Sequence, residues 1–234
     1  MTTAPHTANK ILAALPPREF EQFAAKLRPV PLKLGEILYL PEQKIDYVYF
    51  PESGVLSMLA VLGEDMRIEV GLTGREGFAG MPVFLGVAKS SNQIIVQAEG
   101  AAMRIRAEPA LAEFGRGGAF HDAILGFTHD LFLQVSQTTS CNRYHPVEER
   151  LARWLLMMHD RAASDTMQLT QGFLSWMLGV RNQAISLAAI NLQNAGLIEY
   201  SRGTMNILDR PNLEAAACDC YRVIRAQNDH YFEH

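Results

Sequence analysis

Several features are scarce in this sequence, and each shortage excludes a class of protein. Only three cysteines occur in 234 residues, too few for a disulfide framework and in keeping with a reducing cytoplasm. No run of about 18 apolar residues occurs, so we expect no transmembrane helix and no membrane partner. The first residues carry one charge, Lys10, and a short apolar patch, which is too little for a secretory signal.

Positive charge is also scarce. The 21 lysines and arginines face 25 acidic residues, which gives a net charge of −4, and no lysine follows Lys89. Phosphate contacts supply much of the affinity of a nucleic-acid-binding protein, so a single copy of this chain would bind DNA weakly. Two copies on a symmetric site, also using hydroxyls and backbone N–H groups, would compensate. A DNA-binding function therefore calls for a dimer.

The patterns of common enzyme and metal sites are missing. Residues 71–80 (GLTGREGFAG) lack both the P-loop Lys-Ser/Thr and the GxGxxG spacing. His145 and His159 have no Ser or Cys nucleophile arranged with them, so we expect no enzyme and no catalytic residue. An iron–sulfur cluster needs about four thiolates, and Cys218-x-Cys220 is joined only by Cys141, in a different predicted element. We expect no metal and no cofactor, and interpret the cysteines as small packed residues.

Residues 169–209 are the most informative segment. Thr170 is a candidate N-cap for a first helix, and Gly179 ends it with the backbone freedom that a sharp turn needs. A second helix starts near Arg181 or Asn182 and ends at Gly196, the residue type favoured just beyond a helix. Its polar side chains lie away from its apolar residues, and Arg, Asn and Gln match purine edges in the major groove. The pattern predicts a helix-turn-helix (HTH).

A predicted β-hairpin follows this HTH. Residues 197–208 (LIEY, SRG, TMNIL) read as strand, turn and strand, the expected wing of a winged helix. An ordinary helical hairpin packed beside a β-hairpin would give a similar pattern. The polar face of the second helix and the spacing of the wing favour DNA binding.

The N-terminal half has a different character. Residues 6–28 are predicted to be helical, and short β-prone runs punctuated by turn residues follow from Val30 to about Ala107. Alternation such as that of residues 66–70 indicates half-buried antiparallel strands of a sandwich, jelly roll or small barrel. Residues 77–86 interrupt the alternation and are predicted to hold a short helix.

A long helix is predicted from about Phe120 to Asn142, with a hinge at residues 142–146. Its apolar residues form two stripes, one through Phe120, Ile124, Phe127 and Leu131 and one through Leu125, Phe132 and Val135. Two apolar faces imply burial on two sides, one against the β-rich region and one against the same helix of a second copy. Burial within a monomer is the alternative. A small polar loop over residues 162–168 and a final helix from Asn212 to about Arg225 complete the prediction.

This order of elements resembles the Crp/Fnr family of bacterial transcription regulators over nearly the whole chain. PVEERLARWLLMMHDR (146–161) and LTQGFLSWMLGVRNQAISLAAINLQNAGLI (169–198) are similar to the family's first DNA-domain helix and its HTH. PLKLGEILYLPEQKIDYVYFPESGVLS (31–57) is similar to the start of its cyclic-nucleotide-binding-type β-roll. The resemblance implies an α+β fold with an N-terminal antiparallel β-roll or jelly roll, a long dimerisation helix and a C-terminal winged HTH. The expected domains are the β-roll with N-terminal helices (1–118), the dimerisation helix and hinge (119–145) and the winged HTH domain (146–234).

The resemblance also implies partners. We expect a homodimer through helix 120–142 that binds a two-fold-symmetric operator in double-stranded DNA, with RNA polymerase as a further candidate partner. Family members read bases with an Arg-Glu pair and an Arg one turn later, where this sequence has Asn182, Gln183 and Leu187. Asn and Gln favour adenine, and Leu187 can reach only a thymine methyl or the DNA edge, so an A/T-richer half-site is expected.

The remaining predicted DNA contacts concern the backbone and the polar face. Thr170 and Arg181 match phosphate-contacting positions of the family, and Arg202 in the wing is a candidate for the same role. Ser186 lies on or beside the polar face of the second helix and completes the predicted DNA-binding set.

The effector pocket departs from the family pattern. In cAMP-binding members a Gly-Glu turn holds the ribose and an Arg-Ser pair holds the cyclic phosphate. The corresponding positions here fall at Glu76 and Gly77, and at Asn92 and Gln93 or, by a small slip, Ser90 and Ser91. Neither alternative supplies the arginine, and losing a charge-assisted clamp costs affinity. We therefore expect cAMP not to be the effector.

These observations predict a cytoplasmic, homodimeric, sequence-specific DNA-binding regulator whose β-roll takes an unidentified small-molecule effector. One alternative is a ligand-independent regulator that binds DNA whenever it is made. Another is a small-molecule-binding module whose HTH makes protein contacts.

Overall fold

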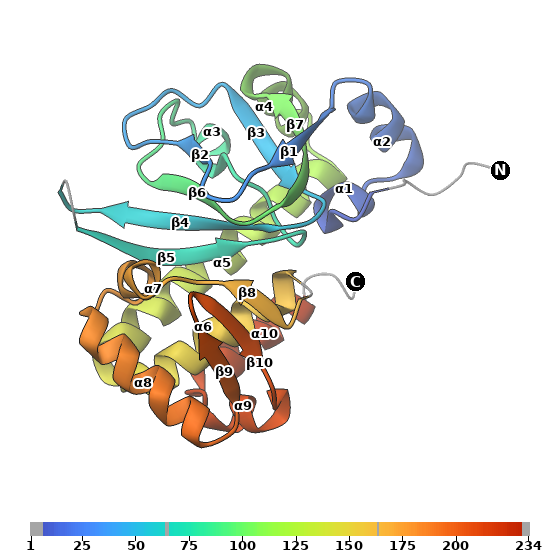
Figure 1. The fold of residues 1–234 in the computed structure, drawn as a ribbon. Coiled ribbons are helices and arrows are strands. Elements are labelled where there is room, and N and C mark those ends of the chain that lie inside the picture. The colour runs from blue at the N-terminus through green and yellow to red at the C-terminus, as the bar shows by residue number, and fades with distance from the viewer. Residues whose placement is uncertain (1–6, 64–65, 163, 231–234) are drawn as a thin grey trace.

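The computed structural model describes residues 7–63, 66–162 and 164–230. Figure 1 shows a β-rich N-terminal half, in blue to green, beside a largely helical C-terminal half, in yellow to red. Helix α5 (Ala119–Tyr144) belongs to both, since it packs on the first and leads into the second. The α+β class and the order of β-rich half, long helix and winged HTH agree with the sequence prediction. The ends of the predicted domains at residues 1 and 234 lie outside the described residues.

Two antiparallel sheets form the β-roll. One has the order β1-β7-β3 and the other the order β2-β6-β4-β5. Their bounds are β1 (Arg28–Leu32), β2 (Ile37–Tyr39), β3 (Tyr47–Pro51), β4 (Val55–Val61), β5 (Arg67–Thr73), β6 (Gln93–Ala98) and β7 (Gly100–Arg106). In β3 the alternate residues Val48 and Phe50 are buried, as expected for a strand with one face on a core.

Four short helices accompany the β-roll: α1 (Lys10–Ala13), α2 (Pro17–Ala24), α3 (Met81–Phe84) and α4 (Ala107–Phe114). The predicted helical stretch of residues 6–28 is thus two helices, because Pro17 starts the second and β1 begins at Arg28; residue 6 lies outside the described residues. Asn9 caps α1, and its amide donates to the carbonyls of Pro51 (3.0 Å) and Gly77 (2.8 Å). The short helix expected within residues 77–86 is α3.

One stripe of helix α5 packs on the β-roll through aromatic contacts. The rings of Phe120 and Phe23 lie 4.7 Å apart between centroids, and those of Phe127 and Phe78 lie 5.2 Å apart. Gly77 lies so close to Phe127 that an added Cβ would fall 2.0 Å from its ring, so only glycine allows this approach. Phe132 on the second stripe is 72% exposed.

The C-terminal half contains α6 (Val147–Ala162), β8 (Thr166–Gln168), α7 (Gln171–Leu178), α8 (Asn182–Asn194), β9 (Ile198–Ser201), β10 (Thr204–Ile207), α9 (Arg210–Ala216) and α10 (Cys220–His230). The strands form one antiparallel sheet of order β8-β10-β9. The prediction of a loop over residues 162–168 is wrong for its last three residues, because Met167 is buried and pairs with Met205.

Two further predictions needed correction. The expected single C-terminal helix is two helices, since Ala217 has an extended backbone (φ −79°, ψ 151°) that ends α9. The expected hinge at residues 142–146 is shorter, because α5 continues to Tyr144 and only His145 and Pro146 separate it from α6. His145 is extended (φ −102°, ψ 145°), as steric contact with the following proline favours.

Buried polar contacts join the two halves. The indole Nε1 of Trp154 on α6 donates to Glu69 Oε1 of β5 (2.7 Å), and Arg161 Nε donates to Glu76 Oε1 (2.7 Å). The side chain of Gln134 bonds both backbone groups of Leu72 in β5, as acceptor at 2.6 Å and donor at 3.1 Å. Strand β5 is therefore held by both α5 and α6. Within the described residues, no helix has the length and apolarity needed to cross a bilayer.

Candidate nucleic-acid interface

Helices α7 and α8 form the predicted HTH. Thr170 Oγ1 accepts a hydrogen bond from the Phe173 backbone N–H (3.2 Å), which makes it the N-cap of α7. Gly179 ends α7 in the left-handed region (φ 60°), where glycine is favoured. Helix α8 then packs on α6 and α7 through four buried residues, Ile185, Ala188, Ala189 and Leu192. The helix boundaries thus follow from local capping signals in the sequence.

The opposite face of α8 is open to solvent. Arg181, Asn182 and Gln183 are exposed at its N-terminal end, and Leu187 one turn later is 62% exposed. Ser186 is half-buried, and its hydroxyl donates to the carbonyl of Asn182 (3.0 Å). The structure therefore places these five predicted residues on α8 or at its N-cap, and the amide and guanidinium groups lie at the N-terminal end of the helix. In helix-turn-helix proteins, the N-terminal end of the second helix is the part that contacts base edges in the major groove.

The wing lies beside the start of α7. Strands β9 and β10 are joined through Arg202 (φ 50°) and Gly203 (φ 80°), the two positive φ values of a type I′ hairpin turn. The Gly203 carbonyl accepts a hydrogen bond from Leu169 N (2.6 Å), and the Tyr200 hydroxyl donates to the Leu169 carbonyl (2.8 Å). These bonds bring exposed Arg202 next to exposed Thr170. Arg202 and Thr170, two predicted phosphate-contacting residues from different elements, therefore lie on the same edge of the winged HTH.

Sequence reasoning missed a neighbouring surface. Trp176 on α7 is 46% exposed, and the Arg67 guanidinium of β5 lies 5.5 Å from its ring centroid. Arg67, Trp176 and Arg181 line a shallow groove together with Leu62 and Ile68. Only the packing of the β4–β5 hairpin against α7 creates this groove, and nothing in the local sequence of either segment signals it.

The predicted effector residues do not converge. A small cavity of about 40 Å³ lies inside the β-roll, and Ser90 and Asn92 line it together with Ser57 and Thr73, which sequence reasoning missed. Glu76 instead forms a buried ion pair with Arg161. Gly77 packs against helix α5. Of the other two predicted residues, Gln93 is buried and Ser91 is exposed, and neither is part of the cavity wall.

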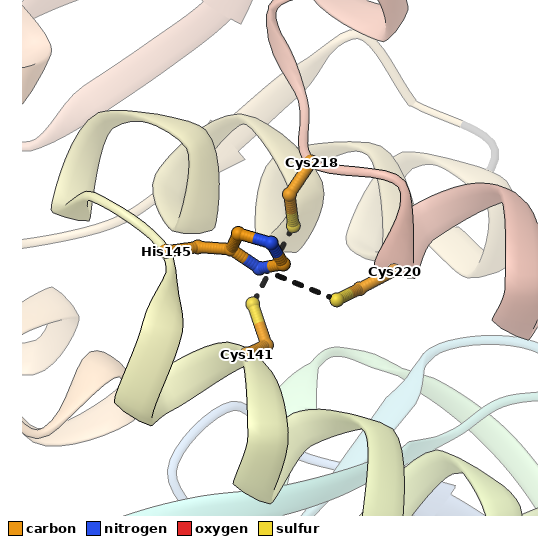
Figure 2. Close-up of side chains that lie close together, drawn as sticks. All are labelled: Cys141, His145, Cys218 and Cys220. Atoms are coloured by element: carbon orange, nitrogen blue, oxygen red, sulfur yellow. Dashed lines mark hydrogen bonds between the residues drawn. The ribbon is translucent and has the colours of Figure 1, made fainter.

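The cysteines form a cluster that the sequence analysis did not anticipate. Helix α10 packs on α5, so Cys141 meets Cys218 at an Sγ–Sγ distance of 3.4 Å. Cys220 Sγ lies 3.4 Å from Nδ1 of His145. Treating Cys141 as remote because it belongs to another element was therefore wrong. Figure 2 shows the three sulfur atoms and the imidazole turned toward one another.

A family model described as a Crp-like helix-turn-helix domain matches residues 149–216. Solved structures of similar fold include a transcriptional regulator of the Crp/Fnr family from Thermus thermophilus, at 16% identity and a TM-score of 0.68, covering 81% of this chain and 98% of that one. FixK2 from Bradyrhizobium japonicum matches at 14% identity and a TM-score of 0.67, with coverages of 82% and 98%. The c-di-GMP-responsive global regulator CLP of Xanthomonas campestris matches at 16% identity and a TM-score of 0.66, with coverages of 82% and 99%.

No curated protein matches the sequence. The structural likenesses establish the fold, and the family model establishes the nature of its C-terminal domain. The chain therefore contains a Crp-like helix-turn-helix domain at residues 149–216, and its fold, with a β-roll and a long helix before that domain, is similar to the folds of solved Crp/Fnr-type regulators.

Proposed function

We propose that this protein is a homodimeric, sequence-specific DNA-binding transcription regulator that acts in the cytoplasm. The observation that carries the proposal is the exposed, polar N-terminal end of α8 within a Crp-like winged HTH. Its buried face is apolar, while the open face presents amide and guanidinium groups. A helix used only for packing has no need of that arrangement.

Base recognition falls to Asn182 and Gln183. Their amides can each donate and accept toward the N6 and N7 positions of adenine, and Leu187 can contact a thymine methyl group. The proposed half-site is accordingly rich in A·T pairs at these positions. Thr170, Arg181 and Arg202 would hold the backbone on either side of the groove, since phosphate contacts fix the register of a reading helix.

The proposed dimer interface is the second apolar stripe of α5, which contains Leu125, Phe132 and Val135. Phe132 is 72% exposed and Leu125 is 43% exposed on this stripe, so a second copy of the helix would remove both from water. A dimer also doubles the few positive charges available for phosphate contacts. We expect size-exclusion chromatography with light scattering to give a dimer, and Phe132→Asp to give a folded monomer. A monomeric parent protein would refute this part of the proposal.

The β-roll cavity is proposed not to take cAMP. A space of about 40 Å³ holds a few water molecules rather than a nucleotide. Its wall supplies hydroxyl and amide groups where a cyclic phosphate needs an arginine clamp. The neighbour CLP is itself described as c-di-GMP-responsive, so this fold is not tied to cAMP. A different small effector, or none, fits the observations.

The test is fluorescence anisotropy of the purified protein on DNA from its own upstream region, at fixed salt, with and without cAMP. Gln183→Ala should cost about 1–3 kcal/mol at one base position and relax the preference there. Arg202→Ala should weaken binding uniformly and lower the salt slope by about one. Arg116→Ala removes an exposed arginine far from the HTH and serves as the charge-matched control. Unchanged binding by Gln183→Ala would remove the base-reading role, and binding that requires cAMP would refute the effector proposal.

A further inference from the structure

The cluster of Cys141, His145, Cys218 and Cys220 has the composition and spacing of a metal site. Its four ligand atoms all lie within 4.8 Å of one another. Zinc–sulfur bonds of about 2.3 Å and zinc–nitrogen bonds of about 2.0–2.1 Å put neighbouring ligand atoms of a tetrahedron roughly 3.6–3.8 Å apart. Two separations here are 3.4 Å, Cys141 Sγ to Cys218 Sγ and Cys220 Sγ to His145 Nδ1, and need only a small expansion to accept an ion.

We propose that these four residues bind one Zn²⁺ ion in a closed, tetrahedral Cys₃His site. Three thiolates and one imidazole are a ligand set of structural zinc sites, and four protein ligands leave no position for substrate. An iron–sulfur cluster would place a core of several atoms between its ligands and spread them further apart. A disulfide between Cys141 and Cys218 would need a separation of about 2.05 Å, against the 3.4 Å observed.

Burial supports a bound ion rather than surface thiols. Cys141, Cys218 and Cys220 are 0%, 5% and 1% exposed, and His145 is half-buried. Gln137 Nε2 donates to Cys220 Sγ (3.1 Å), a contact of the kind that orients a thiolate ligand. The site draws two ligands from the end of α5 and two from the start of α10, segments about 75 residues apart in sequence.

The surrounding charge matches a zinc thiolate centre. Zn²⁺ with three thiolates carries a single net negative charge. Arg150 and Arg153 of α6 are 6% and 2% exposed and lie within electrostatic range of Cys141. Arg150 donates a hydrogen bond to the Leu178 carbonyl and Arg153 donates one to Thr138 Oγ1, while the buried Nε atom of each has no hydrogen-bond partner among the described residues. A zinc thiolate centre would add negative charge beside these two buried cations, of which Arg153 also interacts electrostatically with Glu69.

The proposed ion would act as a clamp on the hinge. His145 is one of the two residues between α5 and α6, and Cys218 and Cys220 flank the start of α10. Binding all four to one ion fixes the end of the helical C-terminal half to the long helix. The inference does not depend on the DNA-binding role, and its test measures metal directly.

The experiment uses the full-length protein, prepared without a polyhistidine tag and under reducing conditions. Elemental analysis should find one zinc ion per chain. Titration with a thiol reagent under native conditions should detect no reactive thiol until a chelator is added. After the chelator is added, all three cysteines should react. Replacing zinc by Co²⁺ should produce the thiolate-to-cobalt charge-transfer and intense d–d bands of tetrahedral sulfur-rich ligation. His145→Asn should lose zinc to a chelator concentration that leaves the parent and the control His129→Asn loaded.

Three results would overturn the proposal. They are iron with visible absorption in place of zinc, a Cys141–Cys218 disulfide in metal-free protein, and three free thiols without stoichiometric metal. Should His145→Asn fail to fold, the zinc content and the cobalt spectrum of the parent protein still decide the question.

Discussion

Replacing Glu69 by glutamine should remove a pH dependence of folding stability that the structure places at the junction of the two halves. Glu69 of β5 is 6% exposed, and its carboxylate accepts hydrogen bonds from Ser57 Oγ (2.7 Å) and Trp154 Nε1 (2.7 Å). Burial raises its pKa from 4.5 to about 7, although the two hydrogen bonds and the charges of Arg153 and Arg161 oppose the rise. The folded protein therefore holds this proton more tightly than the unfolded chain does.

The sign and size of the effect follow from that difference. A raised folded-state pKa gives stability that is fully present below pH 4.5 and is lost as the pH rises through about 7. At about 1.4 kcal/mol per pKa unit, ionising Glu69 costs the folded state on the order of 3 kcal/mol. For a chain of this length that corresponds to a fall in melting temperature of roughly 6–12 °C.

Glutamine keeps the hydrogen bonds without the charge. Its Oε1 can accept from Trp154 Nε1 while its Nε2 donates to Ser57 Oγ, and Ser57 can then donate to Gln97 Oε1, already 3.3 Å away. Glu69→Gln should match the parent protein near pH 5 and exceed its stability by about 3 kcal/mol at pH 8.5. Urea unfolding followed by circular dichroism at several pH values measures both, with the exposed Glu99→Gln as control. Parallel pH profiles for the parent and Glu69→Gln would refute the reasoning.

Three other substitutions test the packing. Glu76→Gln leaves a buried arginine without its ion-pair partner and should cost about 3–5 kcal/mol in urea unfolding, and a cost below 1 kcal/mol would contradict a buried pair. Gly179→Ala should lower stability by about 1–2 kcal/mol because φ is 60° and the new Cβ would lie 2.5 Å from Ile68 Cδ1, whereas Gly172→Ala, with open space around it, should be neutral or stabilising. Asn9→Ala removes a helix cap and two buried hydrogen bonds and should lower the free energy of unfolding by about 2–4 kcal/mol, which calorimetry can check.

The HTH could be predicted from sequence because its signals are local. Thr170 caps α7 through a residue three positions away, and Gly179 ends the same helix through its own backbone conformation. The wing follows from a hairpin turn of two residues. Strand β8 was missed because three residues are too few to show alternation, and only pairing with Met205 makes Met167 part of the sheet.

The contacts between distant segments could not be predicted in this way. The family resemblance predicts Glu76 as an effector residue, whereas the structure pairs its carboxylate with Arg161, 85 residues later. The cysteine cluster depends on how α10 packs on α5, and the sequence spacing of Cys141 and Cys218 does not predict that packing. In each case the tertiary packing of two distant segments decides the chemistry of the side chain.

Helix α6 contacts both the β-roll and helix α8, as does helix α7. Thr73 of β5 lines the β-roll cavity, and the same strand carries Glu69, whose hydrogen bond with Trp154 holds α6. On its other side α6 packs directly against α8, so a displacement of β5 has a contiguous path of packed groups to the DNA-reading face. Packing contacts between these elements do not by themselves produce a conformational change. An occupant of the cavity shifts the position of α8 only if it binds two arrangements of β5 with different affinity. The buried Glu69–Trp154 contact is one of the contacts of β5 that such a rearrangement would change.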